Sequence, residues 1–471
     1  MRRFKACVLR MEGLDVATIV VFSLLSLGVL IANPGYYSHD ELQKLDHVSR
    51  FGIGDYIRHY VVLAQPEAFG TPVRPFSFLI QGGLALFMQN YPVVVHFMDV
   101  LPHVIVAVLL YVLVLRYSQD RLLAVWSALI FAICPMTIIA TGWSAALMDR
   151  WYILFGILAF LFADAYVRRD EGGSSLALAL VFICGALAVL SKETALVLPA
   201  TTVLMLVRYP KLHLRRFIIA TGVWFLPALL FFLYRLPSLV GSFAAHGQGP
   251  YGPSLANVPS GLLVYFTYPF LFGITEANNW VFFSSLRLAL AAFVHGCLIL
   301  GIFVRGGVRP TLTYVFLYFL FLLPVLLIPT RGAHYLYGSS LVFSVALAYL
   351  IRGTRGWERW FQGFGGVLVV SLTIQAAYLE AFVYSIGSCM NSALIGVQSA
   401  YLSHGRPQIV DLRAELGAPA HILYRFTTGR NQIGADYPVR FVVSEWGAER
   451  TRDAVTLAMN RECIVYSLPP E

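Results

Sequence analysis

The residues best suited to chemistry are two adjacent carboxylates, Asp40 and Glu41, which follow the first long apolar run of the chain, 16–32. A Pro-Gly turn separates them from this run, so they lie at the end of a predicted membrane helix, where a charge is costly unless it is solvated or used. A carboxylate within hydrogen-bond reach of a hydroxyl or an amine can act as a general base. Asp40 is therefore the leading catalytic candidate, although most acids in loops are simply solvated.

Further charges lie near the ends of other apolar runs. Arg74 precedes a partly amphipathic segment, 75–89, that we expect to form a helix at the membrane interface, and its planar group of donors suits a phosphate. Lys192 and Glu193 stand between two apolar runs that are too close together for a true loop. Such charges near membrane depth are expected to pair or to contact a polar ligand, such as a lipid phosphate.

Other candidates have an equally simple structural explanation. Asp149 begins a predicted helix, where the helix dipole favours an acid, but it is also a rival catalytic base across the same cavity. Arg331 is followed by His334, Tyr335 and Tyr337, and aromatic residues commonly anchor helices at the membrane interface. These residues predict a second cationic position at the same end of the membrane helices.

Three polar residues, His96, Asp99 and His103, share one face of a predicted membrane helix. They could bind a metal ion, but polar residues on one face of a span more often form hydrogen bonds to neighbouring helices. We favour the structural role, and we expect no metal ion and no other cofactor.

The composition is that of a membrane protein with many spans. The chain is 58% hydrophobic and 13% charged, against about 25% charged in soluble domains. The net charge of +9 comes from Arg residues in short loops between apolar runs, which is the positive-inside pattern. No basic patch interleaved with aromatic residues suggests a nucleic-acid partner, and no Walker loop or dinucleotide-binding fingerprint suggests a nucleotide substrate.

We expect an all-α membrane domain over 1–388, with a long first outside loop at 34–92, and a small soluble α/β domain on the outside over 389–471. About eleven membrane helices are predicted from apolar length and loop charge, at 15–33, 93–115, 121–141, 149–168, 172–190, 194–208, 217–234, 282–304, 310–329, 336–351 and 362–386. In the tail, strands are predicted at 421–426, 439–443 and 463–467, and a helix at 449–460. Cys389 and Cys463 could form a disulfide in an oxidising compartment.

Taken in order, these motifs resemble the GT-C membrane glycosyltransferases, most of all the protein O-mannosyltransferases and their relatives. The similarity covers roughly 1–390. It rests on Asp40-Glu41, on Arg74-Pro75, on His96, Asp99 and His103 (with Asp99 where the family usually has Asn), on Asp149, on the run 190–199, and more loosely on Arg331 and Tyr335 to Tyr337.

The resemblance implies inverting transfer of a sugar from a polyprenyl-phosphate carrier to a glycan, lipid or protein acceptor on the non-cytoplasmic face. Asp40 would be the base and Glu41 would help to position a substrate. The resemblance gives the other residues binding or supporting roles: Arg74, Lys192 and Arg331 would bind the lipid phosphate, and Glu193, His96, His103 and Tyr337 would support the site. The expected location is a bacterial inner membrane, with the site facing the periplasm.

Two other classes remain open. A transporter or flippase for a lipid-linked glycan should have inverted repeats and interrupted helices with polar groups near mid-membrane. This chain has no evident repeat, and its charges lie at the outside ends of the helices instead. A membrane scaffold without catalytic activity, which presents the tail domain, is the third alternative.

Overall fold

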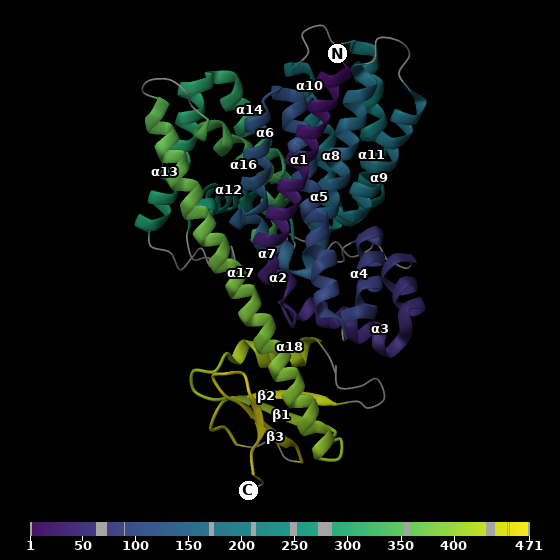
Figure 1. Ribbon diagram of the computed structural model, residues 1–471. Helices are drawn as coiled ribbons and strands as arrows, with labels where there is room; N and C mark the ends of the chain where they lie inside the picture. The colour runs from purple at the N-terminus through teal and green to yellow at the C-terminus, as the bar shows by residue number, and fades with distance from the viewer. Residues whose placement is uncertain are drawn as a thin grey trace.

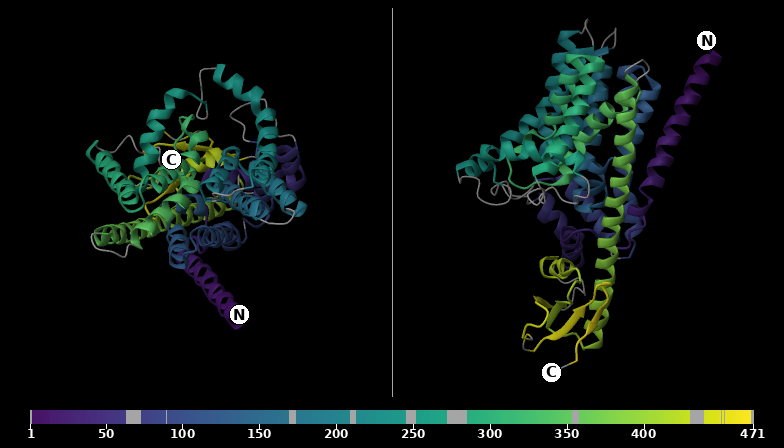
Figure 2. Two further views of the ribbon diagram at one scale, coloured as in Figure 1. Left: turned by 90° about the horizontal axis from the view of Figure 1, so that it is seen from above. Right: turned by 90° about the vertical axis from the view of Figure 1, so that its left-hand side faces the viewer.

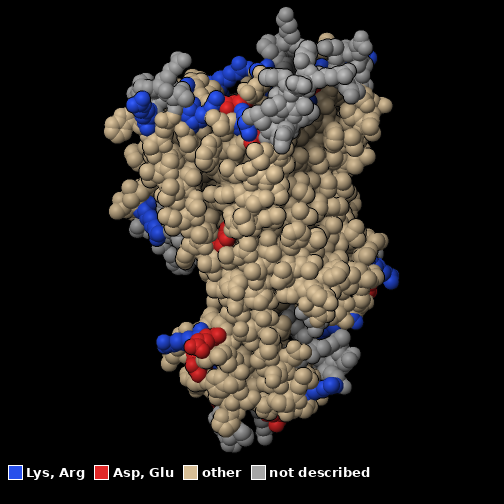
Figure 3. Space-filling model, in the orientation of Figure 1, with Lys and Arg blue, Asp and Glu red and all other residues tan. Residues whose placement is uncertain are grey.

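The computed structural model describes residues 2–62, 73–88, 90–168, 174–208, 213–244, 252–271, 285–352, 358–429, 439–449, 451 and 453–469. Figure 1 shows a bundle of helices with a small sheet domain below it, and the first-loop helices α3 and α4 lie at the same end of the bundle as this domain. On the face shown in Figure 3, the surface between the two ends of the bundle carries few charges. A surface of this kind suits contact with lipid.

The bundle consists of helices that follow the apolar runs of the sequence. They are α1 (Arg2–Ser26), α2 (Gly28–Ile31), α5 (Pro92–Ser118), α6 (Arg121–Ala132), α7 (Pro135–Gly142), η2 (Ser144–Ala146), α8 (Leu147–Arg168), α9 (Ser175–Ser191), η3 (Glu193–Thr202), α10 (Val203–Arg208), α11 (Leu214–Ala244), η4 (Leu255–Asn257), α12 (Val258–Thr267), η5 (Tyr268–Phe270), α13 (Ser285–Gly306), α14 (Val308–Leu320), α15 (Leu323–Leu326), η7 (Ala333–Leu336), α16 (Tyr337–Ile351) and α17 (Glu358–Ser403).

The expected count of eleven spans is not confirmed. In the described part of the chain, six helices are long and apolar enough to cross a membrane, or seven if α6 and α7, bent by 52°, form one span. Helical segments occupy the other expected positions, but they are short or broken. For example, α9 has 17 residues, and the segment after it is a 3-10 helix that contains Pro199. The apolar helices nevertheless define an integral membrane protein.

The segment expected to be the first outside loop contains two helices that pack on each other, α3 (His39–Ile57) and α4 (Pro75–Met88), with η1 (Arg58–Val62) after α3. The expected helix at 75–89 is thus present. Two hydrogen bonds hold α4 on the bundle. Ser77 Oγ donates to the Ser191 carbonyl at 2.9 Å, and Gln81 Nε2 donates to the Ala145 carbonyl at 3.3 Å. The loop is therefore held against the ends of α8 and α9.

The tail domain is a four-stranded sheet in the order β2-β1-β3-β4. Strand β1 (Ile409–Ala414) is parallel to β2 (Arg440–Ser444) and β3 (Val455–Met459), and β4 (Val465–Ser467) is antiparallel to β3. Helix α18 (Ala420–Gly429) follows β1. The predicted strands at 439–443 and 463–467 correspond to β2 and β4, whereas β1 was not predicted.

Two predictions in the tail were wrong. The segment 421–426 is helix α18, since Ile422, Leu423 and Phe426 are buried together with a helical spacing. The segment predicted as a helix, 449–460, contains strand β3. This strand is buried on both faces, so it lacks the alternation that marks an exposed strand.

Helix α17 connects the two parts of the molecule. It continues past the end of the bundle and forms one side of the tail domain (Figures 1 and 2). A disulfide between Cys389 in α17 and Cys463, just before β4, fastens the sheet to this helix. Helix α18 also packs on α3, so the tail domain contacts the helix that carries Asp40 and Glu41.

Candidate active site

Glu41 is a structural anchor at the start of α3. Its side chain is buried, and its two carboxylate oxygens accept hydrogen bonds from the Ser38 backbone N–H at 2.8 Å and the Ser144 backbone N–H at 2.6 Å. With the Ser38 side chain it forms a capping box. Glu41 therefore fixes the first turn of α3 against η2, and its contacts within the chain are those of a positioning residue.

Asp40 lies beside this anchor and is half-buried. Its backbone N–H donates to Ser38 Oγ at 3.3 Å, and Ser38 Oγ is a distant 3.5 Å from Asp40 Oδ2. The amine of Lys44, on the next turn of α3, interacts electrostatically with the Asp40 carboxylate. Asp40 thus combines a fixed backbone with a carboxylate that is partly open to the surroundings.

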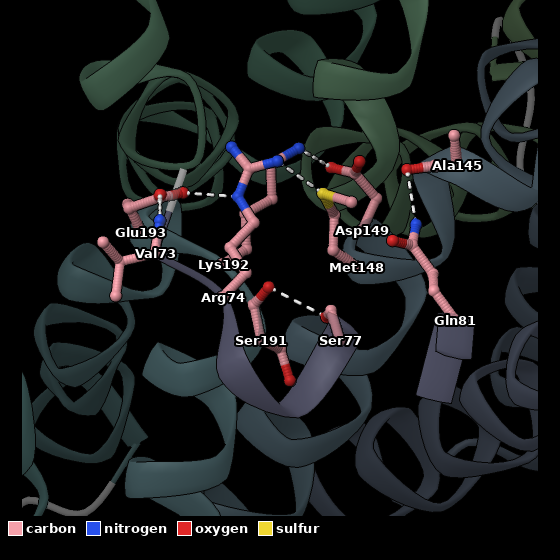
Figure 4. Close-up of polar contacts among 10 residues, drawn as sticks. All are labelled: Val73, Arg74, Ser77, Gln81, Ala145, Met148, Asp149, Ser191, Lys192 and Glu193. Carbon is pink, nitrogen blue, oxygen red and sulfur yellow. Dashed lines mark hydrogen bonds and ion pairs between the residues drawn. The ribbon is translucent and has the colours of Figure 1, made fainter. Parts of the chain in front are cut away.

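The other predicted charges form two ion pairs beside each other (Figure 4). Arg74 Nε is 2.7 Å from Glu193 Oε2, and Lys192 pairs with Asp149 on α8. Lys192 therefore does not take its own neighbour, Glu193, as its ion-pair partner. Lys192 and Asp149 are both almost completely buried, and the second carboxylate oxygen of Asp149 has no hydrogen-bond partner among the described residues.

Arg74 is the centre of a group of positive charges. Lys44, Lys192 and Arg235 each interact electrostatically with it. Burial and the nearby Arg74 charge together lower the pKa of Lys192 to about 8, although Asp149 acts in the opposite direction. Burial would raise the pKa of Glu193, but the Arg74 charge and hydrogen bond outweigh it and leave the pKa lowered. Cations that repel one another electrostatically favour the binding of an anion.

Aromatic residues of η7 lie next to these charges. The Lys192 amine is 4.6 Å from the ring centroid of Tyr335, and the His334 ring is 5.1 Å from that of Trp143. His334 also interacts electrostatically with Lys192 and Arg74. Arg235, Lys44 and Trp143 were not among the residues selected from the sequence, because a lone charge or a lone aromatic ring gives no spacing signal.

Arg331 has partners of its own. It donates to the Asn257 carbonyl at 2.9 Å and to Ser260 Oγ at 3.1 Å, which fastens the segment before η7 to the start of α12. These contacts do not join it to Arg74 or Lys192. Its expected role in phosphate binding thus has no support from a shared contact with those two residues.

The polar face of α5 holds neighbouring segments together. A ring nitrogen of His96 is 2.8 Å from the Gly35 carbonyl oxygen, and His103 Nδ1 is 2.9 Å from the Tyr337 hydroxyl. Asp99 lies between them and forms a buried ion pair with Arg150 at 2.8 Å. Across the part of the chain that the structure describes, no three His, Cys, Asp or Glu side chains gather as a metal site would require.

Comparison with known proteins finds a similarity of fold to solved structures, but no matching family model or curated protein. Neither the family models nor the curated proteins match this chain. Among solved structures, it is similar to the archaeal oligosaccharyltransferase AglB from Archaeoglobus fulgidus in complex with an inhibitory peptide and a dolichol-phosphate, with a TM-score of 0.51 and 12% identity over 91% of this chain. Two structures of an Archaeoglobus fulgidus oligosaccharyltransferase, in the apo form and tethered to an acceptor peptide, have TM-scores of 0.45 and 0.48 and identities of 12% and 14%, again over 91% of this chain.

The match with a TM-score of 0.51 shows that this chain has a fold similar to that of AglB. The match covers 64% of the chain of AglB.

Proposed function

We propose that this protein is a glycosyltransferase that moves a sugar from a polyprenyl-phosphate carrier to an acceptor on the non-cytoplasmic face of the membrane. The observation that carries the proposal is the group of cations around Arg74, which lies at one end of the apolar bundle and near the partly open carboxylate of Asp40. A lipid phosphate is an anion delivered at this depth, and charge-assisted hydrogen bonds to Arg and Lys are the strong contacts for it.

An apolar cavity supports a donor with a long hydrocarbon chain. It has a volume of about 510 Å³ and lies between α5, α8, α10, α14 and α16. Ile153, Gly156 and Phe160 line it from α8, on the face that begins one turn earlier with Asp149. Polar residues, among them Ser118 and Arg309, occur at the opposite end. A carrier whose phosphate lies at Lys192 could place isoprene units in this cavity.

The chemistry assigns one role to each charge. Asp40 takes the proton of an acceptor hydroxyl while the acceptor oxygen bonds to the anomeric carbon of the sugar. The bond from that carbon to the phosphate oxygen breaks, and the electron pair stays on the phosphate. Arg74 and Lys192 stabilise the charge that develops there. Because the nucleophile enters opposite the leaving phosphate, the anomeric configuration is inverted.

The tail domain supports the assignment of the membrane side. Disulfides persist in oxidising compartments, so the Cys389–Cys463 bond favours a non-cytoplasmic tail. Basic residues at the opposite end of the bundle, such as Arg116, Arg121 and Arg305, follow the positive-inside pattern. We infer a bacterial inner membrane, with α3, α4 and the tail facing the periplasm.

Reconstitution tests the proposal directly. The purified protein would be placed in lipid nanodiscs with polyprenyl-phosphate sugars extracted from its host membranes, and the acceptor fraction would be analysed by mass spectrometry. We expect addition of one sugar to a protein, lipid or glycan acceptor, with loss of the addition in Asp40→Asn. Movement of labelled lipid-linked sugar across proteoliposomes without any transfer would instead make the protein a transporter.

A further inference from the structure

Lys44 is a cation beside the site that the proposed reaction does not yet use. It lies four residues after Asp40 on α3, and its amine is held over aromatic rings, 3.7 Å from the ring centroid of Tyr60 in η1 and 4.8 Å from that of Phe78 in α4. These rings bring the amine into the space between α3 and α4. Phe78 is one helical turn from Arg74, whose carbonyl accepts its backbone N–H at 2.9 Å.

The amine has unused hydrogen-bonding capacity. Within the described ranges, Lys44 forms no ion pair and no hydrogen bond. By contrast, Arg74 and Lys192 each have a carboxylate partner. An ammonium group has three N–H donors, and ring faces attract the charge without satisfying all of them. Burial and the Arg74 charge together lower the pKa of Lys44 to about 8, while Asp40 opposes this. A nearby anion would stabilise the charged form of the amine and so offset the free-energy cost of burying it.

We propose that Lys44 binds the phosphate of the lipid carrier together with Arg74, as the third cation of the phosphate site. The proposal rests on the proposed function and extends it to a residue for which neither the motifs nor the fold similarity gives a role. Its basis is position, because the amine lies 4.8 Å from the ring centroid of Phe78, one helical turn from Arg74, and Lys44 is one turn after Asp40 on α3.

A phosphate fits this position better than a neutral sugar hydroxyl. Asp40, Glu193 and Asp149 already provide carboxylates near the cations, so the ammonium of Lys44 adds a further positive charge that favours an anion over a neutral group. During transfer the leaving phosphate gains negative charge, and an ammonium that is already in place stabilises it without reorganisation.

Lysine labelling tests this contact without requiring catalysis. The chain has only four lysines, Lys5, Lys44, Lys192 and Lys211, so acetylation of each is readily followed by mass spectrometry. The protein would be labelled near pH 7.5 in phosphatidylcholine nanodiscs, alone, with undecaprenyl phosphate, or with phosphatidylglycerol. We expect undecaprenyl phosphate to slow the labelling of Lys44 and Lys192 by about tenfold, and to leave Lys5, near the start of α1, unchanged. The N-terminus of the chain lies at the opposite end of the bundle from the sheet domain (Figure 1).

Each other outcome has a distinct meaning. Protection of Lys192 without protection of Lys44 overturns the role of Lys44 and leaves the proposed function intact. Equal protection of Lys44 by phosphatidylglycerol overturns it in favour of an ordinary lipid headgroup. No protection of either lysine contradicts the carrier-phosphate site itself.

Kinetics of three variants give an independent test. Lys44→Met keeps the length of the stem and removes the charge, so we expect the KM for the donor to rise about tenfold or more. Lys44→Arg should restore most of the loss. Arg58→Met, which removes an exposed charge where α3 meets η1, is the control and should resemble the wild type. Equal donor KM in Lys44→Met and Arg58→Met would overturn the proposal.

Discussion

Arg74 and Glu193 form an ion pair in which Arg74 Nε lies 2.7 Å from Glu193 Oε2, and this contact joins the start of α4 to the turn between α9 and η3. The Val73 backbone N–H donates to the other oxygen of the same carboxylate at 3.3 Å. Glu193 is thereby turned away from its neighbour Lys192, which pairs with Asp149 instead. The consecutive residues Lys192 and Glu193 thus form ion pairs with two different segments, Lys192 with Asp149 of α8 and Glu193 with Arg74 just before α4.

This crossed arrangement predicts which residues are energetically coupled. Arg74→Ala and Lys192→Ala should each weaken donor binding, since each removes charge-assisted bonds worth about 1.5–3 kcal/mol. In double-mutant cycles on donor affinity, the Arg74–Glu193 and Lys192–Asp149 pairs should show the large coupling energies. The Lys192–Glu193 pair is the matched control and should show a smaller one. If removing Glu193 fully rescued Lys192→Ala, Lys192 would be a structural partner of Glu193 and not a phosphate ligand.

Donor binding should weaken at alkaline pH. The pKa values of Lys44 and Lys192 are both lowered to about 8 from an ordinary 10.5, so both amines lose their charge as the pH rises through about 8. Donor affinity measured from pH 7 to pH 9.5 should therefore fall over this range, and Lys192→Arg and Lys44→Arg should each flatten the fall, because arginine stays charged.

The same lowered pKa values determine whether stability rises or falls with pH. Between about pH 8 and 10.5, the unfolded chain binds more protons than the folded one, so the free energy of unfolding from these two groups rises with pH. Donor affinity and stability without donor should thus change in opposite directions. A donor affinity that stays constant up to pH 9.5 would contradict a role for either lysine.

The sequence showed which charged residues stand at the ends of apolar runs, but it did not show which residues they pair with. Asp40, Arg74 and Lys192 were located because each stands at the end of an apolar run, where charge is costly and therefore conspicuous. Their contacts could not be predicted, since Arg74 and Glu193 are 119 positions apart and no local pattern encodes such a pairing. Glu41 was expected to help to position a substrate, and its contact with the Ser144 N–H of η2 could not be predicted, because it depends on tertiary packing.

Similar physics explains the errors in the fold. Strand β3 has no alternation because both of its faces are buried. The count of eleven spans is not confirmed, and apolar length alone does not reveal a bend such as that between α6 and α7 in the expected span 121–141. The two cysteines of the tail were recognised as a possible pair, but only the folded chain brings their Cα atoms to 5.2 Å.

The disulfide should hold the tail domain on α17. Cys389 and Cys463 are 74 positions apart, and closing a loop of that size typically stabilises by about 2–4 kcal/mol. We expect Cys463→Ser, or mild reduction, to speed proteolysis after Ser403 while the membrane bundle stays intact, as followed by mass spectrometry of the fragments. Cys297→Ser, which replaces a free thiol in α13, is the control. Equal cleavage rates before and after reduction would mean that packing of α18 on α3 suffices to hold the tail.

The assignment of the base gives the most direct prediction. Asp40→Asn keeps the shape of the side chain and removes the proton acceptor, so turnover should fall by at least ~100-fold with donor binding nearly unchanged. The two oxygens of Glu41 accept from the Ser38 and Ser144 N–H groups, one each. Glu41→Gln has a single acceptor oxygen and can therefore keep only one of these hydrogen bonds. Its effect should therefore be smaller and should come with a lower thermal stability, because it loosens the start of α3.

Asp149 is the alternative base, and its role can be separated from that of Asp40. Its carboxylate has one oxygen without a hydrogen-bond partner in the described part of the chain, but its other oxygen holds Lys192. Asp149→Asn should for that reason act mainly on donor affinity, by releasing a lysine of the phosphate site. Single-turnover transfer by Asp40→Asn, Glu41→Gln and Asp149→Asn in one membrane preparation, at saturating donor, distinguishes binding from chemistry. Near-normal transfer by Asp40→Asn together with an inactive Asp149→Asn would place the base on α8, across the cavity from α3.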